Sequence, residues 1–128
     1  MEHPTVFPSL VYDDAPAAAE LLASAFGAER HALYAGDDGA IHHAEYRFGN
    51  GMVMFGSAAD GKPATRGGGA GIYVVVEDAD AHCARARAAG AEIVDDLHDT
   101  DYGSRDYSAR DPEGNMWYFG TYQPFAAG

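Results

Sequence analysis

The pattern of hydrophobic and polar residues at the start of the chain predicts a strand followed by a helix. Residues 5–12 are rich in apolar, β-branched and aromatic side chains, which favours a strand. Asp13 or Asp14 would cap the helix, because an aspartate side chain accepts hydrogen bonds from the free N–H groups of a first turn. Gly27 would end it. The apolar positions of this helix recur at helical spacing and comprise Ala18, Leu21, Leu22, Ala25 and Phe26.

Three further strands complete the first half of the chain. Runs of β-branched and aromatic residues place them at about 30–35, 41–48 and 52–57. Gly49-Asn50-Gly51 would join the last two, since tight hairpin turns prefer glycine and asparagine. The predicted unit is therefore βαβββ. Residues 59–69, rich in Gly, Lys and Pro, follow as a linker.

The second half of the chain predicts the same order of elements. Residues 72–76 are continuously apolar, which predicts a strand in the centre of a sheet. Asp78 would cap a second helix that extends through Ala89 and ends at Gly90. Three strands are expected at about 92–97, 105–110 and 116–122, with a hairpin turn at 111–115 whose Pro and Gly suit such turns.

The two halves also resemble each other residue by residue. Three blocks recur in the same order: 11–15 with 75–79, 27–29 with 90–92, and 52–56 with 116–120. The first and last recur at a spacing of 64 residues and the middle one at 63. Recurrence in one order predicts two copies of one supersecondary unit, so that corresponding positions face the same way.

Length and composition limit the class of protein. The 128 residues suit a single domain, because two units of about 60 residues would each be marginal alone and should share a core. The formal net charge of −12 repels nucleic acid and anionic lipid and would attract a cationic ligand, although the same charge also serves solubility alone. The first residues lack a signal peptide and no apolar run could cross a bilayer, so we expect a cytoplasmic protein. The single cysteine, Cys83, excludes an intrachain disulfide.

The arrangement of elements resembles a known superfamily. Two βαβββ units with an Asp-Pro-x-Gly-Asn turn before an aromatic last strand are similar to the glyoxalase/bleomycin-resistance/extradiol-dioxygenase proteins, also called vicinal oxygen chelate proteins. The most specific segment is 111–122, supported by residues 10–16 before the first helix. The resemblance implies an α+β fold in which two βαβββ repeats form an open, cupped mixed sheet with the helices outside. It also implies a homodimer.

The resemblance raises the question of a metal. Enzymes of this superfamily usually bind a divalent cation inside the cup, through His and Glu of the first and last strands of each unit. The resemblance places these positions at Phe7 and Met54 and, 64 residues later, at Gly71 and Tyr118. Phe and Gly carry no donor, a thioether is a soft ligand, and a lone phenol is weak. We therefore expect no metal and no other cofactor, and none of the family's metal-dependent chemistry.

Two histidines deserve separate consideration. His42 and His43 are adjacent, so in a strand they point to opposite faces and cannot readily chelate one ion. His43 and Glu45 share a face and could hold a metal with a third ligand, but we favour an exposed or hydrogen-bonded cross-sheet contact. With Tyr73, this pair could also supply general acid–base chemistry if the three side chains cluster.

Alternation along the strands predicts which side chains line the cup. The opposite parity, which includes Val53, Phe55, Trp117 and Phe119, should pack beneath the helices. Methionine and aromatic side chains in the lining suit a small apolar, aromatic or cationic molecule, and Gly56 and Gly71 would leave space for it. Arg105 could fix a carboxylate of that molecule or pair with a neighbouring Asp, which we favour. The predicted ligand-binding residues are Phe7, Met52, Met54, Tyr73, Tyr118, Met116 and Arg105.

Three functions from different classes follow from this lining. The first is a metal-free protein of the glyoxalase/bleomycin-resistance type that binds a small molecule. The second is a lyase, isomerase or dioxygenase-like enzyme acting on a small oxygenated metabolite, with an atypical metal or a Tyr/His/Glu acid–base site. The third is a dimeric module whose cup is filled by its own side chains. The absence of the metal-ligand set favours the first.

Overall fold

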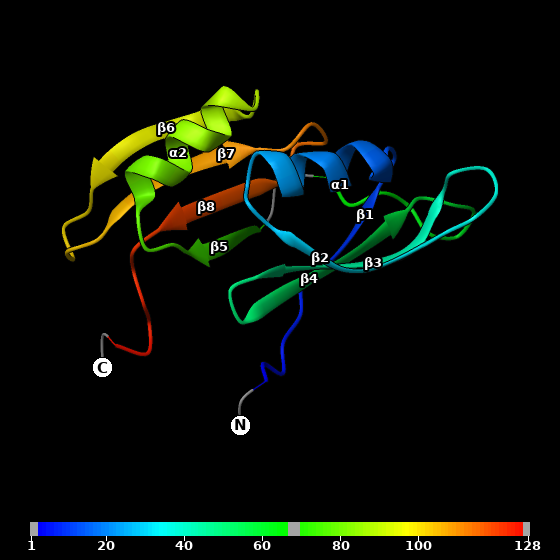
Figure 1. Ribbon diagram of the computed structural model, residues 1–128, viewed down its shortest axis with the longest axis horizontal. Helices are drawn as coiled ribbons and strands as arrows, with labels where there is room; N and C mark the ends of the chain where they lie inside the picture. The colour runs from blue at the N-terminus through cyan, green and yellow to red at the C-terminus, as the bar shows by residue number, and fades with distance from the viewer. Residues whose placement is uncertain (1–2, 67–69, 127–128) are drawn as a thin grey trace. The chain divides into compact units, whose positions relative to one another are not determined.

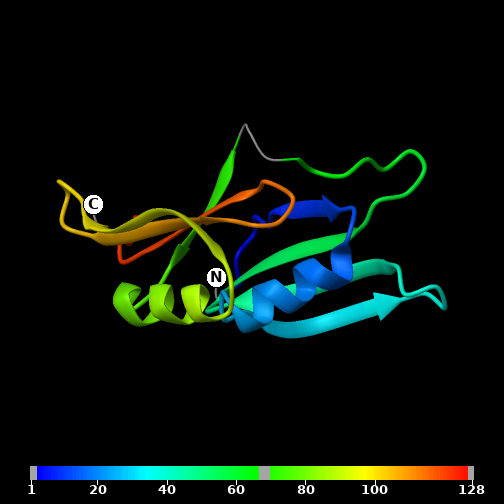
Figure 2. The same ribbon diagram turned by 90° about the horizontal axis from the view of Figure 1, so that it is seen from above.

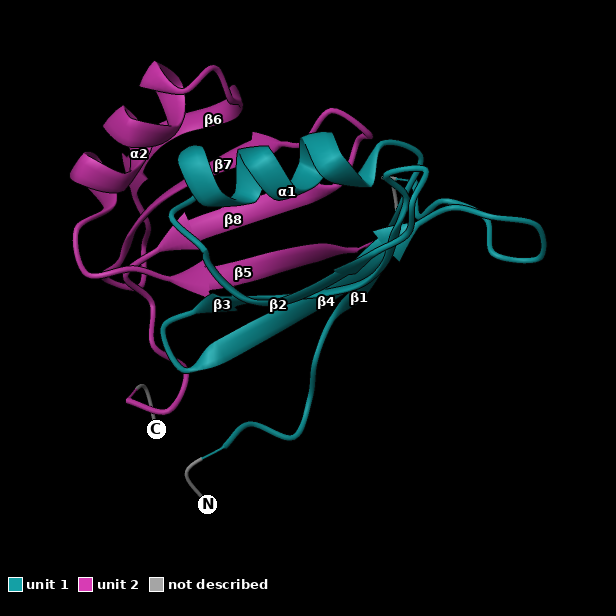
Figure 3. Cartoon of the chain, turned by 45° about the vertical axis from the view of Figure 1, so that its right-hand side comes forward, with its two compact units in different colours: residues 1–66 teal, residues 67–128 magenta. Residues whose placement is uncertain are grey.

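The chain folds as two compact units, residues 1–66 and 67–128 (Figure 3). The computed structural model describes residues 3–66 and 70–126. Each unit contains one helix and four strands in the order βαβββ (Figure 1). These elements confirm the predicted α+β class with two βαβββ repeats. The predicted linker at 59–69 contains the boundary between the units, and its residues 67–69 lie outside the described part of the chain.

The first unit is a four-stranded mixed sheet with one helix. Strand β1 lies at one edge and pairs in parallel with β4, while β3 pairs in antiparallel fashion with β4 and with β2. Helix α1 packs against β1, β3 and β4 (Figure 2). The elements are β1 (Ser9–Tyr12), α1 (Ala15–Ser24), β2 (Glu29–Ala35), β3 (Ile41–Phe48) and β4 (Gly51–Ser57).

The second unit repeats this topology. Its strand order is β5-β8-β7-β6, with β5 parallel to β8 and the other pairs antiparallel. Helix α2 packs against β6, β7 and β8. The elements are β5 (Gly71–Val75), α2 (Ala79–Ala88), β6 (Glu92–Asp99), β7 (Arg105–Arg110) and β8 (Met116–Gly120). The prediction that the apolar 72–76 strand is central is wrong for this sheet, since β5 is an edge strand.

The helix boundaries follow the predicted caps. Asp14, one of the two candidates, accepts a hydrogen bond from the N–H of Ala17 at 3.1 Å, and Asp78 accepts from Ala81 at 3.0 Å. Gly27 and Gly90, which follow the helices, have φ of 79° and 90°. This left-handed conformation costs glycine little, because it has no Cβ to collide with the backbone. No helix among the described residues is long and apolar enough to cross a membrane.

Two predicted strands are shorter than expected. The first begins at Ser9 rather than at residue 5, because ladder pairing with β4 starts at Ser9 and Pro8 has no N–H to donate. The carbonyl of Pro8 still accepts from Met54 N at 2.9 Å. The last strand ends at Gly120 instead of residue 122. Beyond it the chain leaves the sheet, although the N–H of Tyr122 remains bonded to a side chain of β5.

The helix-facing residues form the core of each unit. Val53 and Phe55 are buried under α1, and Trp117 and Phe119 are fully buried under α2, as the alternation predicts. Aromatic rings dominate the second core: Tyr107 stacks on Phe119 with ring centroids 5.3 Å apart. Burial of such large side chains supplies most of the stability of a small unit.

Asp111 organises the hairpin between β7 and β8. Its buried carboxylate accepts hydrogen bonds from the backbone N–H groups of Glu113 and Asn115, each at 3.0 Å. It also accepts from the Asn115 amide and, at 3.1 Å, from the indole N–H of Trp117. The Asp-Pro-x-Gly-Asn segment is therefore more than a turn. It ties the hairpin to the largest side chain of the core.

Candidate functional site

The face of the second sheet opposite α2 carries two neighbouring tyrosines. Tyr73 on β5 and Tyr118 on β8 are register partners, and their exposed fractions are 38% and 39%. Trp117 and Phe119, on either side of Tyr118, point toward α2 and are 0% exposed. Successive side chains of β8 thus alternate between a buried face against α2 and an exposed aromatic face. We call this side of the sheet the tyrosine face. It comprises the exposed Tyr73 and Tyr118, the partly exposed Met116 and the buried Asp106.

Tyr118 lies over Gly71. A Cβ built at Gly71 would collide with the Tyr118 ring. The expectation that Gly71 leaves space for a ligand is therefore wrong, because the Tyr118 ring takes that space. Gly56 does not leave room either: a Cβ there would meet the His42 carbonyl and the Lys62 ammonium at 3.0 Å. Gly71 instead lets the Tyr118 ring approach the backbone of the edge strand closely.

Tyr73 is held in place by two hydrogen bonds. Its hydroxyl donates to Asp106 Oδ1 at 3.0 Å and accepts from the N–H of Tyr122 at 3.1 Å. Burial raises the pKa of Tyr73 to about 12; the Tyr122 N–H opposes this rise and the Asp106 carboxylate adds to it. Gly120 makes the contact possible, because any Cβ there would collide with both Asp106 and the Tyr73 hydroxyl. The ring is thus fixed and its hydroxyl is neutral near pH 7.

Two more tyrosines extend this surface. The Tyr122 ring is nearly perpendicular to that of Tyr73, at an interplanar angle of 84° and a centroid distance of 6.5 Å. Tyr102, in the turn between β6 and β7, is nearly perpendicular to Tyr122 at 78° and 5.3 Å. Tyr102 is 65% exposed. Neither Tyr102 nor Tyr122 was among the predicted ligand-binding residues, and Tyr122 was expected inside the last strand.

The corresponding face of the first sheet carries acid–base groups. His43 and Glu45, on β3, are within hydrogen-bond distance, with Nε2 and Oε2 2.8 Å apart. His31 on β2 lies 3.9 Å from the other oxygen of Glu45. We call these three residues the histidine face. The pair is hydrogen-bonded, as expected, but the contact lies within β3 and not across the sheet. The His31 contact was not predicted, and it lies beside a register shift between Arg30 and Ala32.

The predicted residues of the first unit lie on or next to β4 and β1, on one side of this cluster. Met54 is the register partner of both Ser9 and Glu45, and Met52 that of Arg47. Both methionines are partly exposed. Phe7 precedes β1 and is 38% exposed. Tyr73 belongs to the other unit, so the first unit contains only the His43 and Glu45 members of the predicted acid–base set.

The predicted metal positions do not fit a divalent cation. Phe7, Met54, Gly71 and Tyr118 offer no imidazole, carboxylate or thiolate. A side chain at Gly71 would in addition collide with the Tyr118 ring. Within residues 3–66 and 70–126 there is no group of three or more His, Cys, Asp or Glu side chains placed to hold a metal ion.

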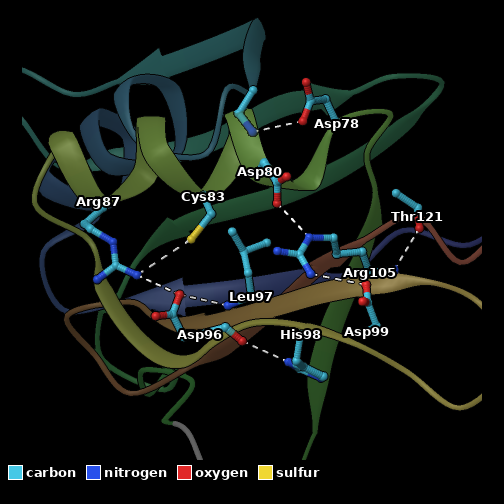
Figure 4. Close-up of polar contacts among 11 residues, drawn as sticks. Asp78, Asp80, Cys83, Arg87, Asp96, Leu97, His98, Asp99, Arg105 and Thr121 are labelled. Carbon is cyan, nitrogen blue, oxygen red and sulfur yellow. Dashed lines mark hydrogen bonds and ion pairs between the residues drawn. The ribbon is translucent and has the colours of Figure 1, made fainter.

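Arg105 lies away from the tyrosine face. It begins β7 and reaches toward α2, where Nε donates to Asp80 at 2.7 Å and Nη1 to Asp99 at 3.2 Å (Figure 4). These two hydrogen bonds raise the pKa of the Arg105 guanidinium. The sequence allowed Arg105 to bind a ligand carboxylate or a neighbouring Asp, and the structure pairs it with Asp.

The helix side of each unit has a groove at the same place in the repeat. Between α2 and β6 a groove of about 400 Å³ is lined by Cys83, Arg87 and Leu97, among others. Its counterpart between α1 and β2 measures about 300 Å³ and includes Ala19, Ala23 and Leu33, each 64 positions earlier.

Cys83 is a packing residue of the larger groove. Burial raises the pKa of its thiol, while the Arg87 guanidinium, 4.0 Å from Sγ, opposes that rise. Arg87 is also paired with Asp96 at 2.9 Å (Figure 4). A thiol kept protonated by burial is a poor nucleophile.

Comparisons with known proteins agree with this architecture. An uncharacterized protein of Mycobacterium bovis, Mb0911c, is 35% identical over 125 residues, covering 91% of this chain and 82% of the relative. The crystal structure of TioX from Micromonospora sp. ML1 is similar with a TM-score of 0.75 at 34% identity, covering 94% of this chain and 97% of that chain. The fosfomycin resistance protein FosX from Listeria monocytogenes shares the fold, with a TM-score of 0.76 at 11% identity over 100% of both chains. Residues 3–119 match the family model, and the chain belongs to the Glyoxalase/Bleomycin resistance protein/Dioxygenase superfamily.

Proposed function

We propose that this protein binds a small apolar, aromatic or cationic compound on the tyrosine face, without a metal. The observation that carries the proposal is the side-by-side pair of Tyr73 and Tyr118, each about two-fifths exposed at 38% and 39%. A solvated sheet surface is usually covered by polar side chains, so exposed neighbouring aromatic rings suggest a binding surface. Met116, partly exposed beside them, adds an adaptable apolar contact.

The preorganisation of the face supports binding. Tyr73 is fixed by its bonds to Asp106 and to the Tyr122 backbone, and Tyr118 rests over Gly71. A ligand that stacks on these rings would therefore lose little affinity to the ordering of flexible side chains. The residues at the expected metal positions support a metal-free mode, because they lack the donors that divalent cations prefer.

The wider setting of the protein is proposed on composition and family. The net charge of −12 argues against nucleic acid and anionic membranes as partners. We infer a cytoplasmic homodimer in which residues 1–128 act as one domain. Light scattering coupled to size exclusion would measure the mass of the assembly, and a single unfolding transition would support one cooperative domain.

A titration with two fluorescent probes tests the proposed function. Ethidium supplies a planar aromatic cation and N-phenyl-1-naphthylamine a neutral aromatic molecule. At least one should bind saturably at one molecule per chain. Tyr118→Ala should weaken that binding by about tenfold, because loss of an aromatic stacking partner costs about 1–3 kcal/mol and about 1.4 kcal/mol is a factor of ten.

Phe125→Ala is the matched control. Phe125 is 98% exposed, so its removal tests whether any exposed aromatic side chain affects the probes. Binding should stay unchanged in this variant. Equal losses in both variants, or no saturable binding by either probe, would contradict the proposed function.

A second candidate function rests on the histidine face. The 2.8 Å contact between His43 and Glu45 is the geometry by which a carboxylate orients an imidazole for proton transfer. An enzyme that removes a proton next to a carbonyl could use this pair. The protein should then catalyse exchange of deuterium from solvent into hydroxyacetone, and Glu45→Gln should reduce that rate. Exchange no faster than in buffer alone would remove this candidate for that substrate class.

A further inference from the structure

Three tyrosines form an aromatic corner at one end of the tyrosine face. Tyr122 stands nearly perpendicular to Tyr73, at 84°, and to Tyr102, at 78°. The centroid distances from Tyr122 are 6.5 Å and 5.3 Å. Rings that meet at right angles present faces in different directions around one point, which is how proteins surround an alkylated ammonium group.

The corner has an unusual balance of burial and exposure. Tyr102 is 65% exposed although it is in contact with another aromatic ring, and Tyr73 is 38% exposed. A cluster that served only packing would bury its rings, as Tyr107, Trp117 and Phe119 are buried on the other face of the same sheet. The rings of the corner are thus assembled but remain accessible.

A carboxylate lies directly behind the rings. Asp106 is 9% exposed and accepts the Tyr73 hydroxyl proton in a 3.0 Å hydrogen bond. The cation Arg105, its neighbour in sequence, is paired with Asp80 and Asp99 on the α2 side. The field around the corner is therefore negative: the aromatic faces carry partial negative charge, and a carboxylate and a strongly acidic chain reinforce it.

We propose that Tyr73, Tyr102 and Tyr122 form a recognition site for an organic ammonium cation, with Asp106 as the electrostatic support. The inference rests on the proposed function, because the corner is continuous with the tyrosine face through Tyr73. It narrows the apolar, aromatic or cationic ligand to one that carries an alkylated ammonium group. The ring faces attract that group, and its methyl groups fill the space between them.

Choline and 3,3-dimethylbutan-1-ol separate the effect of charge from that of shape. The two molecules have the same shape, but choline has a charged quaternary nitrogen where the alcohol has a neutral quaternary carbon. Both would be titrated into the full-length protein and followed by ligand-observed NMR. Choline should bind at least about threefold more tightly than the neutral alcohol, since an exposed cation–π contact is worth roughly that factor or more.

Variants at Tyr102 test the contribution of the rings. Tyr102→Leu should remove most of the preference for choline, whereas Tyr102→Phe, which keeps the ring, should retain it. Because Tyr102 is highly exposed, both variants should keep the fold, and a thermal melt would check this. Asp106→Asn should lower choline affinity and leave that of the neutral alcohol unchanged, provided that the melt shows an intact fold.

The outcomes distinguish the corner from the wider face. Equal affinity for choline and its neutral isostere would overturn the proposal that the corner recognises an ammonium cation. Tyr118-dependent binding of ethidium or N-phenyl-1-naphthylamine would still stand in that case. Preference for choline that persists in Tyr102→Leu would also overturn that proposal. If neither pair of compounds binds saturably, the corner and the proposed function fail together.

Discussion

The two units share one backbone plan but present different chemistry on equivalent faces. Ser9 beside Met54 in the first sheet corresponds to Tyr73 beside Tyr118 in the second, by register as well as by the spacing of 64 residues. The first sheet has imidazole and carboxylate groups at its centre, while the second has phenols. The two units therefore share a scaffold, and the residues at a few paired positions give each face its chemistry.

The position of acidic groups differs in the same way. Glu45 lies opposite Met54, whereas Asp106 lies opposite Gly120, so the two carboxylates occupy different positions in the repeated sheet. In the first sheet the carboxylate is Glu45, paired with an imidazole and partly exposed. In the second it is Asp106, buried and bonded to a phenol. The first face thus carries a partly exposed pair of His43 and Glu45. On the second face, the buried Asp106 holds the Tyr73 ring in place.

The largest expected effect is on stability, and it distinguishes the β7–β8 hairpin from the β3–β4 hairpin. Asp111→Ala should lower the free energy of unfolding by roughly 3 kcal/mol or more, because it leaves the Trp117 indole N–H and other buried donors without their acceptor. Asn50→Ala, in the exposed turn of the first hairpin, should change stability by less than about 0.5 kcal/mol. Urea denaturation followed by Trp117 fluorescence would measure both.

The two stability losses together show whether the hairpins differ in their contribution to the fold. Similar small losses in both variants would show that the Asp111 network is not a stabilising feature of the second unit. A large loss in Asn50→Ala alone would reverse the comparison.

A smaller effect is expected from the paired glycines beside the two faces. Gly120→Ala should cost about 2 kcal/mol of stability, because the new methyl group collides with Asp106 and Tyr73, and it should weaken probe binding severalfold. Gly56→Ala, crowded by the His42 and Ile41 carbonyls at 3.0 and 3.2 Å, should also destabilise but should leave binding unchanged. Thermal melts and ethidium titrations would measure the two properties, and equal binding losses would contradict a site confined to the second unit.

Much of this architecture could be predicted from sequence. The strand and helix order follows from hydrophobic periodicity, and Asp14 and Asp78 follow from capping chemistry. The parity of Trp117, Tyr118 and Phe119 follows from the two-residue period of a strand. These features depend on local rules, which a sequence carries directly.

The side-chain contacts could not be predicted in the same way. His31 lies 3.9 Å from Glu45 beside a register shift between Arg30 and Ala32, an irregularity that simple strand alternation does not predict. The Tyr118 ring occupies the space beside Gly71 that the missing side chain was expected to leave open. Tyr73, Asp106 and Tyr122 meet through residues 33 and 49 positions apart, a contact that depends on strand register.

A change in the histidine face should have little effect on stability. Glu45→Gln should alter the free energy of unfolding by less than about 1 kcal/mol, because half-exposed ion pairs contribute little. It should also leave ethidium and N-phenyl-1-naphthylamine binding unaltered. Denaturation and the two titrations would test this, and a marked loss of binding would bring the first unit into the ligand site.

The smallest effect expected is a pH dependence specific to Tyr73. Its pKa in the folded state, about 12, lies above the ordinary value of 10, so folding favours the neutral phenol. That stabilisation is complete below about pH 10 and is lost as pH rises toward 12. Tyr73→Phe should lack this part of the loss. A difference absorbance titration of the two proteins should show a tyrosine that ionises near pH 12, and a midpoint near 10 would contradict the buried contact with Asp106.

The most direct measurement of the central claim is the aromatic NMR spectrum of tyrosine-labelled protein during titration with ethidium and with N-phenyl-1-naphthylamine. If the tyrosine face binds the ligand, resonances of Tyr73 and Tyr118 shift with a single saturating dependence on probe. Tyr34, 61% exposed beside His43 in the first unit, should stay unchanged. Shifts at Tyr34 with none at Tyr73 and Tyr118 would place binding on the first unit and contradict the account.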